Sequence, residues 1–433
     1  MEVNGNMLIA AAVLVGAYAL IFTEVLHRAT AALLGAVVMI VVGMFIGFYD
    51  QEKALQAIDA NTLILLLAMM MMIAILRPTG AFEYAAVRMT KLAGGDPRVL
   101  LVYLTLAVSL ISMILDNVTT VIIFAPLTVL ITRLLKLNPM PFLIAEAILS
   151  NIGGAATLVG DPPNIMIGSA AHNDFTRFLE HMGPPIALVW AGTVLLLLFL
   201  FREDLKTRHS GVVELDESKA IKDPVALALA LVAMGVIVVL FFVHHLLHLY
   251  PAFVALAGLV LAMLLLRTDP DQLYTEVHWS VLIFFAGLFV IVGGVESSGL
   301  LELIGRHLAV MAANPDMLLV TCLALMWVAA VLSAVVDNIP FTVAMIPIIL
   351  GLEKSGINVT PLWWALAIGV GLGGNGTHIG ATANIIVVTE SEKTGDPRSR
   401  ITPAAWLRVG LPTMVVSLVL ASGVYALFFD YFL

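Results

Sequence analysis

The sequence predicts an all-α polytopic membrane protein: an inverted repeat of two five-span halves, each with a re-entrant hairpin and a discontinuous helix. Three observations lead to this fold class. The 433 residues are 61% hydrophobic and only 12% charged, whereas soluble domains have about 45–50% apolar and about 25% charged residues. An Asp-Asn pair inside a long apolar run occurs twice. A glycine-rich segment follows each pair.

Uncharged runs long enough to cross a bilayer predict the ordinary spans. The first lacks the basic region of a cleavable signal peptide, because Glu2 is the only charged residue before it, and we interpret it as retained. The runs lie at about 7–22, 29–49, 60–76, 183–201, 225–243, 249–266, 279–295 and 409–429.

The two Asp-Asn pairs interrupt apolar runs that are too long for one span. Asp116 is the only charged residue from 99 to 132, and Asp337 is the only one from 317 to 352. A helix of about 34 residues would be about 51 Å long, but the hydrocarbon core is about 30 Å thick. The chain must therefore turn at each aspartate, which predicts hairpins at about 99–132 and 317–352. A carboxylate and broken backbone at this depth require a protein-lined cavity.

The glycine-rich segments predict the discontinuous helices, because glycine at this density unwinds a helix interior. We place these broken spans at about 141–170 and 361–389. The segments match at a spacing of 220 positions, pairing Gly153, Gly154, Thr157, Gly160 and Asn164 with Gly373, Gly374, Thr377, Gly380 and Asn384. The repeat divides the chain into halves 1–205 and 223–433, joined by the polar linker 206–222.

The distribution of basic residues predicts the orientation. Five crossings per half is an odd number, so the second half must be inverted relative to the first. With the linker cytoplasmic, 17 of the 21 Lys and Arg lie inside, as the positive-inside rule requires. The other four are Lys53, Arg177, Arg306 and Lys354. We therefore predict a multi-pass inner (plasma) membrane protein with both termini external.

The two aspartates are the first candidates for coupling-ion sites. A charge at the bilayer centre costs at least about 2.5–3.5 kcal/mol, so Asp116 and Asp337 need a partner or water. Carboxylate oxygens suit Na⁺, and a desolvated carboxyl can carry a proton. The alternative is that each aspartate only caps the following half-helix. Asp161 and His378 lack counterparts in the other half and are further coupling candidates.

Asparagine and threonine side chains at the hairpin tips and broken spans supply neutral donors and acceptors. Both places leave backbone groups unpaired, and these cost least when they share one cavity. We therefore predict that Asn117 lies beside Asn151–Thr157, and Asn338 beside Asn375–Thr377. The alternative is that these side chains only satisfy each other and loose backbone groups.

Four segments, "DNVTTVIIFAPLT", "NIGGAATLVGDPPNIMI", "DNIPFTVAMIP" and "LGGNGTHIGATANI", resemble the ion-transporter superfamily. The branch is the one with ArsB arsenite permeases, NhaD sodium–proton antiporters and the melanosomal P protein. The resemblance covers essentially the whole chain. It implies a dimeric secondary transporter with an elevator-type motion. The implied first site is Asp116, Asn117, Thr119, Asn151, Gly153, Thr157 and Asn164. The implied second site is Asp337, Asn338, Thr342, Gly374, Asn375, Thr377 and Asn384.

The chain departs from parts of that superfamily. Its dicarboxylate importers have Ser-Asn-Thr at the hairpin tips, and its characterised arsenite permeases tend to alter the Asp-Asn order. The tips of this chain are closer to the P-protein branch. The resemblance therefore indicates the transporter class more strongly than the substrate.

We expect an arsenite or antimonite efflux permease coupled to the proton gradient, with a sodium–proton antiporter as the alternative. A carboxylate or anion symporter is third. An intramembrane aspartyl protease could use Asp50 and Asp161, but Leu158 stands where its motif needs glycine. We therefore expect no enzyme activity, and no cofactor besides a coupling proton or Na⁺, held at the hairpin tips if it is sodium.

The remaining expectations concern partners. The lipid bilayer and a small inorganic substrate are expected, with a second copy of the chain and no nucleic acid. Nucleotide-driven pumping would need a separate ATPase subunit, because no phosphate-binding loop ending in Gly-Lys-Ser/Thr is present. The single cysteine, Cys322, offers neither an intrachain disulfide nor a metal cluster.

The orientation can be tested with single cysteines at Ser210 and Ser355 in a Cys322→Ala background. An impermeant maleimide added to intact cells is expected to label the cysteine at 355 and to leave the one at 210 unlabelled, because the linker is predicted to be cytoplasmic. Lysed cells, in which both sites must react, are the control. The reverse pattern would overturn the inverted layout.

Overall fold

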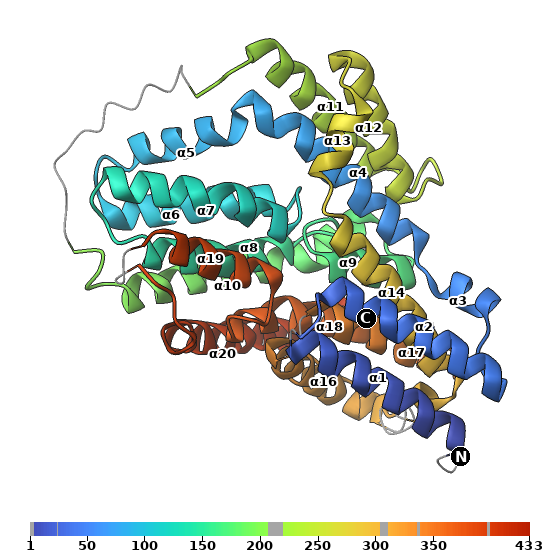
Figure 1. Cartoon of the computed structure of the whole chain (residues 1–433). Helices are drawn as coiled ribbons and strands as arrows, with labels where there is room; N and C mark the ends of the chain where they lie inside the picture. The colour runs from blue at the N-terminus through green and yellow to red at the C-terminus, as the bar shows by residue number, and fades with distance from the viewer. Residues whose placement is uncertain (1–3, 24, 207–219, 304–310, 336–337, 396–398) are drawn as a thin grey trace.

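A computed structural model describes residues 4–23, 25–206, 220–303, 311–335, 338–395 and 399–433 (Figure 1). Within these ranges every regular element is a helix, and eight helices are long and apolar enough to cross a membrane. This confirms the all-α polytopic fold class. The inversion of the halves and the depth of the hairpins in the bilayer stay predictions.

The described residues of the first half form eleven helical elements. They are α1 (Gly5–Thr23), α2 (Arg28–Ile46), α3 (Gln51–Ala57), α4 (Ala60–Leu76), η1 (Arg77–Thr79), α5 (Ala81–Leu92), α6 (Pro97–Ser112), α7 (Asn117–Leu134), α8 (Met140–Gly154), α9 (Pro162–Ala170) and α10 (Phe175–Leu200).

The second half has helices at corresponding positions. They are α11 (Pro224–Val243), α12 (Pro251–Leu266), α13 (Pro270–Glu276), α14 (Trp279–Ser297), α16 (Pro315–Val335), α17 (Asn338–Lys354), α18 (Thr360–Gly373), η3 (Gly374–Gly376), α19 (Thr382–Lys393), α20 (Pro403–Leu427) and η4 (Phe429–Phe432). The last long helices, α10 and α20, begin before the uncharged runs that predicted them, because each has a polar first part.

Helices of both halves are interleaved in a first group, which includes α2, α4, α12 and α14 and which we call the frame. In the frame α2 packs along α14, and α4 packs along α12. Small residues permit the close approach: a Cβ added at Gly287 of α14 would lie 2.9 Å from the Ala32 carbonyl carbon of α2. Neither half therefore buries its apolar surface alone.

The hairpins and broken helices form the second group, which we call the core group. Here α6 packs on α8 and α16 packs on α18, within each half. The other hairpin arms cross between halves, because α7 packs on α19 and α17 packs on α9. Figure 1 shows α6, α7, α8 and α19 stacked beside one another.

The chain turns at the positions predicted from the lone aspartate in the first hairpin. Helix α6 ends at Ser112, α7 begins at Asn117, and Asp116 is the extended N-cap residue between them. The corresponding Asp337 lies outside the described residues. The arms at 97–112 and 117–134 are each shorter than the single helix that an unbroken run would form.

Glycine sets the spacing between each broken helix and its hairpin. A Cβ added at Gly153 would lie 2.6 Å from the Ser109 carbonyl oxygen, and one at Gly373 would lie 2.5 Å from the Ala330 Cα. These are backbone atoms, which cannot move aside as a flexible side chain can. Contact between α6 and α8, and between α16 and α18, therefore requires glycine at these positions.

We expect Gly153→Ala and Gly373→Ala each to destabilise the protein by about 1–3 kcal/mol, the usual effect of overpacking a close contact. The measurement is the midpoint of thermal unfolding in detergent, followed by size-exclusion chromatography. Gly423→Ala in α20 is the matched control, since an added Cβ there meets nothing within 4 Å. Midpoints equal to that of the control would contradict the close-packing interpretation.

Candidate functional site

The Asp116 side chain caps α7. Its Oδ1 accepts a hydrogen bond from the Thr119 backbone N at 2.9 Å, and its Oδ2 accepts one from the Thr119 hydroxyl at 2.6 Å. The side chain is almost fully buried. The capping alternative is therefore what the structure shows for Asp116, and a further coupling role stays a prediction.

Six buried side chains, one of them a carboxylate, meet where the hairpin tips and helix breaks converge. We call them the amide cluster: Asn117, Asn151, Asp161, Asn338, Asn375 and Asn384. Each is at most 5% exposed. The cluster draws on both halves: it contains Asn117 and Asn151 of the implied first site and Asn338, Asn375 and Asn384 of the implied second site.

Asn151, on α8, joins the two halves. It accepts a hydrogen bond from the Asn117 amide at 3.0 Å through Oδ1. Its own amide donates to Asn375 Oδ1 at 2.9 Å and to Asn384 Oδ1 at 3.0 Å. One carboxamide thus connects the first hairpin tip, the first broken helix and the second broken helix.

Asp161, the N-cap residue of α9, receives amides from both hairpin tips. Asn117 Nδ2 lies 3.4 Å from its Oδ1, and Asn338 Nδ2 lies 3.3 Å from Oδ1 and 3.2 Å from Oδ2. Asn117 is beside Asn151 as predicted. The Asn338 side chain, however, turns to Asp161 of the other half, because α17 packs against α9.

The predicted contact between each tip and its own broken span is made by threonine. The Thr157 hydroxyl donates to the Met113 carbonyl oxygen at 2.5 Å, and the Thr377 hydroxyl donates to the Ala334 carbonyl oxygen. The pairs correspond across the repeat. Both threonines therefore join a helix break to the adjacent hairpin by a hydrogen bond. This agrees with the alternative that these side chains satisfy loose backbone groups.

The second asparagine of each broken span closes the break. Asn164 donates to the carbonyl oxygens of Gly154 at 3.2 Å and Thr157 at 2.8 Å. Asn384 donates to those of Gly374 at 2.8 Å and Thr377 at 2.9 Å. These bonds satisfy carbonyls that the broken helix leaves free, which hydrocarbon cannot do.

The other predicted site residues have local roles. The Thr342 hydroxyl donates to the Asn338 carbonyl oxygen at 2.8 Å, within α17. A Cβ at Gly374 would lie 3.0 Å from the Gly380 carbonyl oxygen, so glycine permits this tight turn. His378 is half-buried in the turn before α19 and is not among the described members of the amide cluster.

Two polar atoms in the cluster have no hydrogen-bond partner among the described residues: the acceptor Asn117 Oδ1 and the donor Asn375 Nδ2. Leaving such groups unpaired in a buried place costs about 1–3 kcal/mol each. They are therefore the atoms with which the cluster can bind an ion or a small polar molecule. The described hydrogen-bond partners in the cluster are amides, carbonyl oxygens and a carboxylate, with no Lys or Arg.

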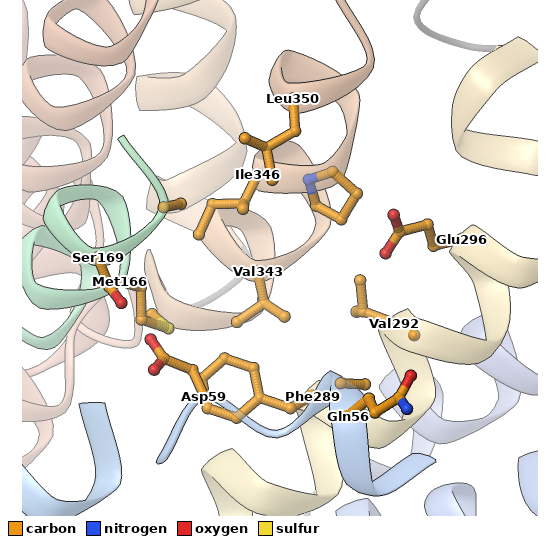
Figure 2. A pocket seen from close by; sticks show the side chains of 14 residues that line it. Gln56, Asp59, Met166, Ser169, Phe289, Val292, Glu296, Val343, Ile346 and Leu350 are labelled. Carbon is orange, nitrogen blue, oxygen red and sulfur yellow. The ribbon is translucent and has the colours of Figure 1, made fainter. Parts of the chain in front are cut away.

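A cavity of about 270 Å³ opens between frame and core group (Figure 2). The side chains of Asp59 and Glu296 line it from the frame, and those of Met166 on α9 and Val343 on α17 line it from the core group. Met166 follows Asp161 by five residues and Val343 follows Asn338 by five. At 1.5 Å per residue, the cavity begins about 8 Å from the amide cluster along both helices.

A smaller cavity borders the first residues of α9 and α17. Asp116, Pro162 and Ile339 line it from the core group, and Arg28 and His278 line it from the frame. The Arg28 guanidinium also donates to the Thr382 hydroxyl at the start of α19, at 3.0 Å. Residues next to the cluster thus line two cavities, and a frame residue contacts the core group at the smaller one.

Sequence reasoning missed Glu146, a fully buried residue of α8 that accepts a hydrogen bond from the Thr128 hydroxyl. The signal was available: Glu146 is a lone acidic residue in the apolar run from 137 to 160, the same feature that drew attention to Asp116.

The fold, with its buried polar cluster beside two cavities, is that of a multi-pass membrane transporter. The family model described as citrate transporter (CitMHS) matches residues 18–369, and the chain belongs to this family. A 46 kDa membrane protein of Mycobacterium leprae is 36% identical over 426 residues, covering 96% of this chain and 97% of that protein.

Two further relatives extend the comparison. The human P protein is 33% identical over 498 residues, covering 96% of this chain and 59% of the longer relative. The YdaH transporter of Alcanivorax borkumensis, a crystal structure with an unusual topology, superposes with a TM-score of 0.61 at 16% identity. It covers 94% of this chain and 99% of that chain, which shows a shared fold.

Asn151→Asp tests the junction between the halves. The carboxylate keeps the size of asparagine and still accepts from Asn117, but it cannot donate to Asn375 or Asn384. We expect a loss of several kcal/mol, at about 1–3 kcal/mol for each buried group left unpaired. The measurement is thermal unfolding in detergent. The control is Asn358→Asp, an exposed residue whose Oδ1 accepts from the Thr360 backbone N. Equal midpoints would show that Asn151 does not join the halves.

Proposed function

We propose that the chain is a secondary active transporter that exports a small inorganic substrate, arsenite or antimonite, in exchange for protons. The observation that carries the proposal is the amide cluster, where the amides of both hairpin tips, Asn117 and Asn338, reach the carboxylate of Asp161. Neutral trihydroxides of arsenic or antimony are small donors and acceptors. They match the unpaired Asn117 Oδ1 and Asn375 Nδ2.

Asp161 supplies the proton site in this proposal. A carboxylate that takes up a proton on one side of the membrane and releases it on the other changes what the adjacent amides can bind. When Asp161 is ionised, the Asn117 and Asn338 amides donate to it; when it is protonated, its own O–H competes as a donor. Proton binding therefore alters the same hydrogen bonds that would hold the substrate.

In the proposed transport cycle, the cluster would reach the two sides of the membrane alternately through the two cavities. In the predicted topology, the larger cavity lies at the external side, because Lys53 and Lys354 belong to the ends of α3 and α17 that are predicted to be external. The core group would move against the frame so that the amide cluster meets one opening at a time. The proposed inner-membrane homodimer would supply the fixed frame.

A sodium–proton antiporter is the second candidate. Hard oxygen ligands suit Na⁺, and the cluster offers the free Asn117 Oδ1 next to the Asp161 carboxylate. The larger cavity also presents two carboxylates, Asp59 and Glu296 (Figure 2). This candidate differs from the first in cargo, while Asp161 keeps its role.

Citrate, the substrate in the family's description, fits the described site less well. A multiply charged anion would have to approach Asp161 and would find no Lys or Arg among the cluster's described hydrogen-bond partners, at a cost of several kcal/mol. Proteolysis fits less well too, because Asp50 is the exposed N-cap of α3 whereas Asp161 is buried.

The test is transport by the purified protein in sealed vesicles under an imposed pH gradient, with arsenite, Na⁺ and citrate as separate cargoes. We expect arsenite movement that depends on the gradient and stops with a protonophore. Vesicles without protein are the control. Movement of Na⁺ alone would establish the second candidate, and movement of citrate alone would overturn both.

In the same assay we expect Asp161→Asn to abolish coupling, with at least a tenfold loss of gradient-driven flux, because asparagine cannot release a proton. Asp116→Asn is the informative comparison, since asparagine also caps helices well. A similar loss there would establish a coupling role for Asp116 besides its cap. Wild-type flux in Asp161→Asn would refute the proposed proton site.

A further inference from the structure

Glu146 lies in the middle of α8, outside the amide cluster, and is fully buried. Its Oε1 accepts a hydrogen bond from the Thr128 hydroxyl of α7. Its Oε2 has no hydrogen-bond partner among the described residues. The position has no acidic counterpart in the second half, where Leu366 and Ala367 occupy the corresponding part of α18. Packing alone therefore does not require a carboxyl group here.

The surroundings of Glu146 provide no compensating charge. No described Lys, Arg or His forms an ion pair with it. The helices that pack on α8 and contribute charged or titratable side chains are α6, α7, α10 and α19. Apart from Tyr103 in the middle of α6, those groups lie toward the helix ends. They are Arg98, Tyr103, Arg133, Arg177, Glu180, His181, Glu390, Glu392 and Lys393. Most of them are exposed, and Lys393 pairs with Glu390 at 2.5 Å.

An ionised carboxylate in such a place costs several kcal/mol unless it is paired. A protonated carboxyl avoids this cost, because Oε1 still accepts from Thr128 while Oε2 carries the proton. The arrangement thus suits a group that is neutral when enclosed and ionises only when water reaches it. A structural acid has no need of the free oxygen.

Glu146 is also connected to the amide cluster through both helices that hold it. It precedes Asn151 by five residues on α8, which is about 8 Å along the helix. Its partner Thr128 is on α7, the helix that begins at Asn117. Between Asn117 and Thr128 lies Pro126, which lacks the backbone N–H of a regular helix, so α7 can bend there. Asn117 at the hairpin tip and Thr128, the partner of Glu146, are therefore on the same helix, α7. A movement of α7 would change both the tip and the Glu146–Thr128 contact.

We propose that Glu146 is a second proton-binding site of the transporter, separate from Asp161. The proton adds to the Glu146 carboxylate when α7 moves from α8 and admits water, is held while the contact is closed, and returns to water on the other side of the cycle. Each cycle then carries one proton on Glu146 in addition to the proton on Asp161. This inference rests on the proposed proton coupling for its transport consequence, but its chemistry can be tested without any substrate.

The first test measures protonation directly. Purified wild-type protein in lipid nanodiscs is treated with dicyclohexylcarbodiimide, an apolar reagent that adds to protonated carboxyl groups, and peptides are analysed by mass spectrometry. We expect modification of Glu146 at neutral pH, falling as the pH is raised. Modification is expected to be absent at the exposed Glu180 of α10. Unmodified Glu146 across this range would overturn the proposal, whether or not the protein transports arsenite.

The second test measures the number of protons moved per substrate from the gradient at which net flux reverses. We expect Glu146→Gln to transport with one proton fewer per cycle, because glutamine still accepts from Thr128 but cannot ionise. Glu180→Gln is the matched control and should keep the wild-type ratio. An unchanged ratio in Glu146→Gln would reduce Glu146 to a packing residue. If wild-type protein fails to couple to protons at all, the proposed function fails, and the labelling result stands by itself.

Discussion

The rest of the structure depends on one constraint: broken backbone enclosed in a membrane protein must find its hydrogen-bond partners within the protein. The chain meets this constraint with short polar side chains at the breaks. Asn164 and Asn384 bond to the carbonyls that their own breaks expose, and Thr157 and Thr377 bond to the turns of their own hairpins. Two side-chain atoms of the amide cluster, Asn117 Oδ1 and Asn375 Nδ2, still lack a partner among the described residues, and a ligand can pair with them.

Because the halves are interleaved, asparagines from both of them meet in one cluster. Each hairpin lies against the broken helix of its own half, and its second arm also packs against that of the other half, as α7 does on α19. Asn151 and Asp161 sit at the junctions. In the proposed cycle, a change in the protonation of Asp161 would alter hydrogen bonds to both hairpin tips at once.

Asp116 and Asp161, the two buried aspartates considered as proton-binding sites, differ in what they contact. Both carboxylate oxygens of Asp116 accept hydrogen bonds from Thr119, so Asp116 stabilises the start of α7. Asp161 receives amides from both halves and faces the breaks. Capping is a short-range role that any good acceptor fulfils, whereas a carboxylate that accepts hydrogen bonds from both halves would link the two hairpin tips in the proposed cycle. This difference is why the proton is assigned to Asp161.

The sequence by itself determined the features that are short-range along the chain. Composition established the membrane fold class, and the repeated glycines indicated the helix breaks. The lone Asp116 indicated the turn before α7, where its side chain caps the helix by accepting from the Thr119 backbone N three residues later. Contacts between distant segments were decided only by the tertiary structure. Asn338 meets Asp161 across 177 positions, and Glu146 meets Thr128 because α7 folds back on α8. Packing of whole helices chooses these partners, and a repeat spacing carries no information about which half a side chain will turn to.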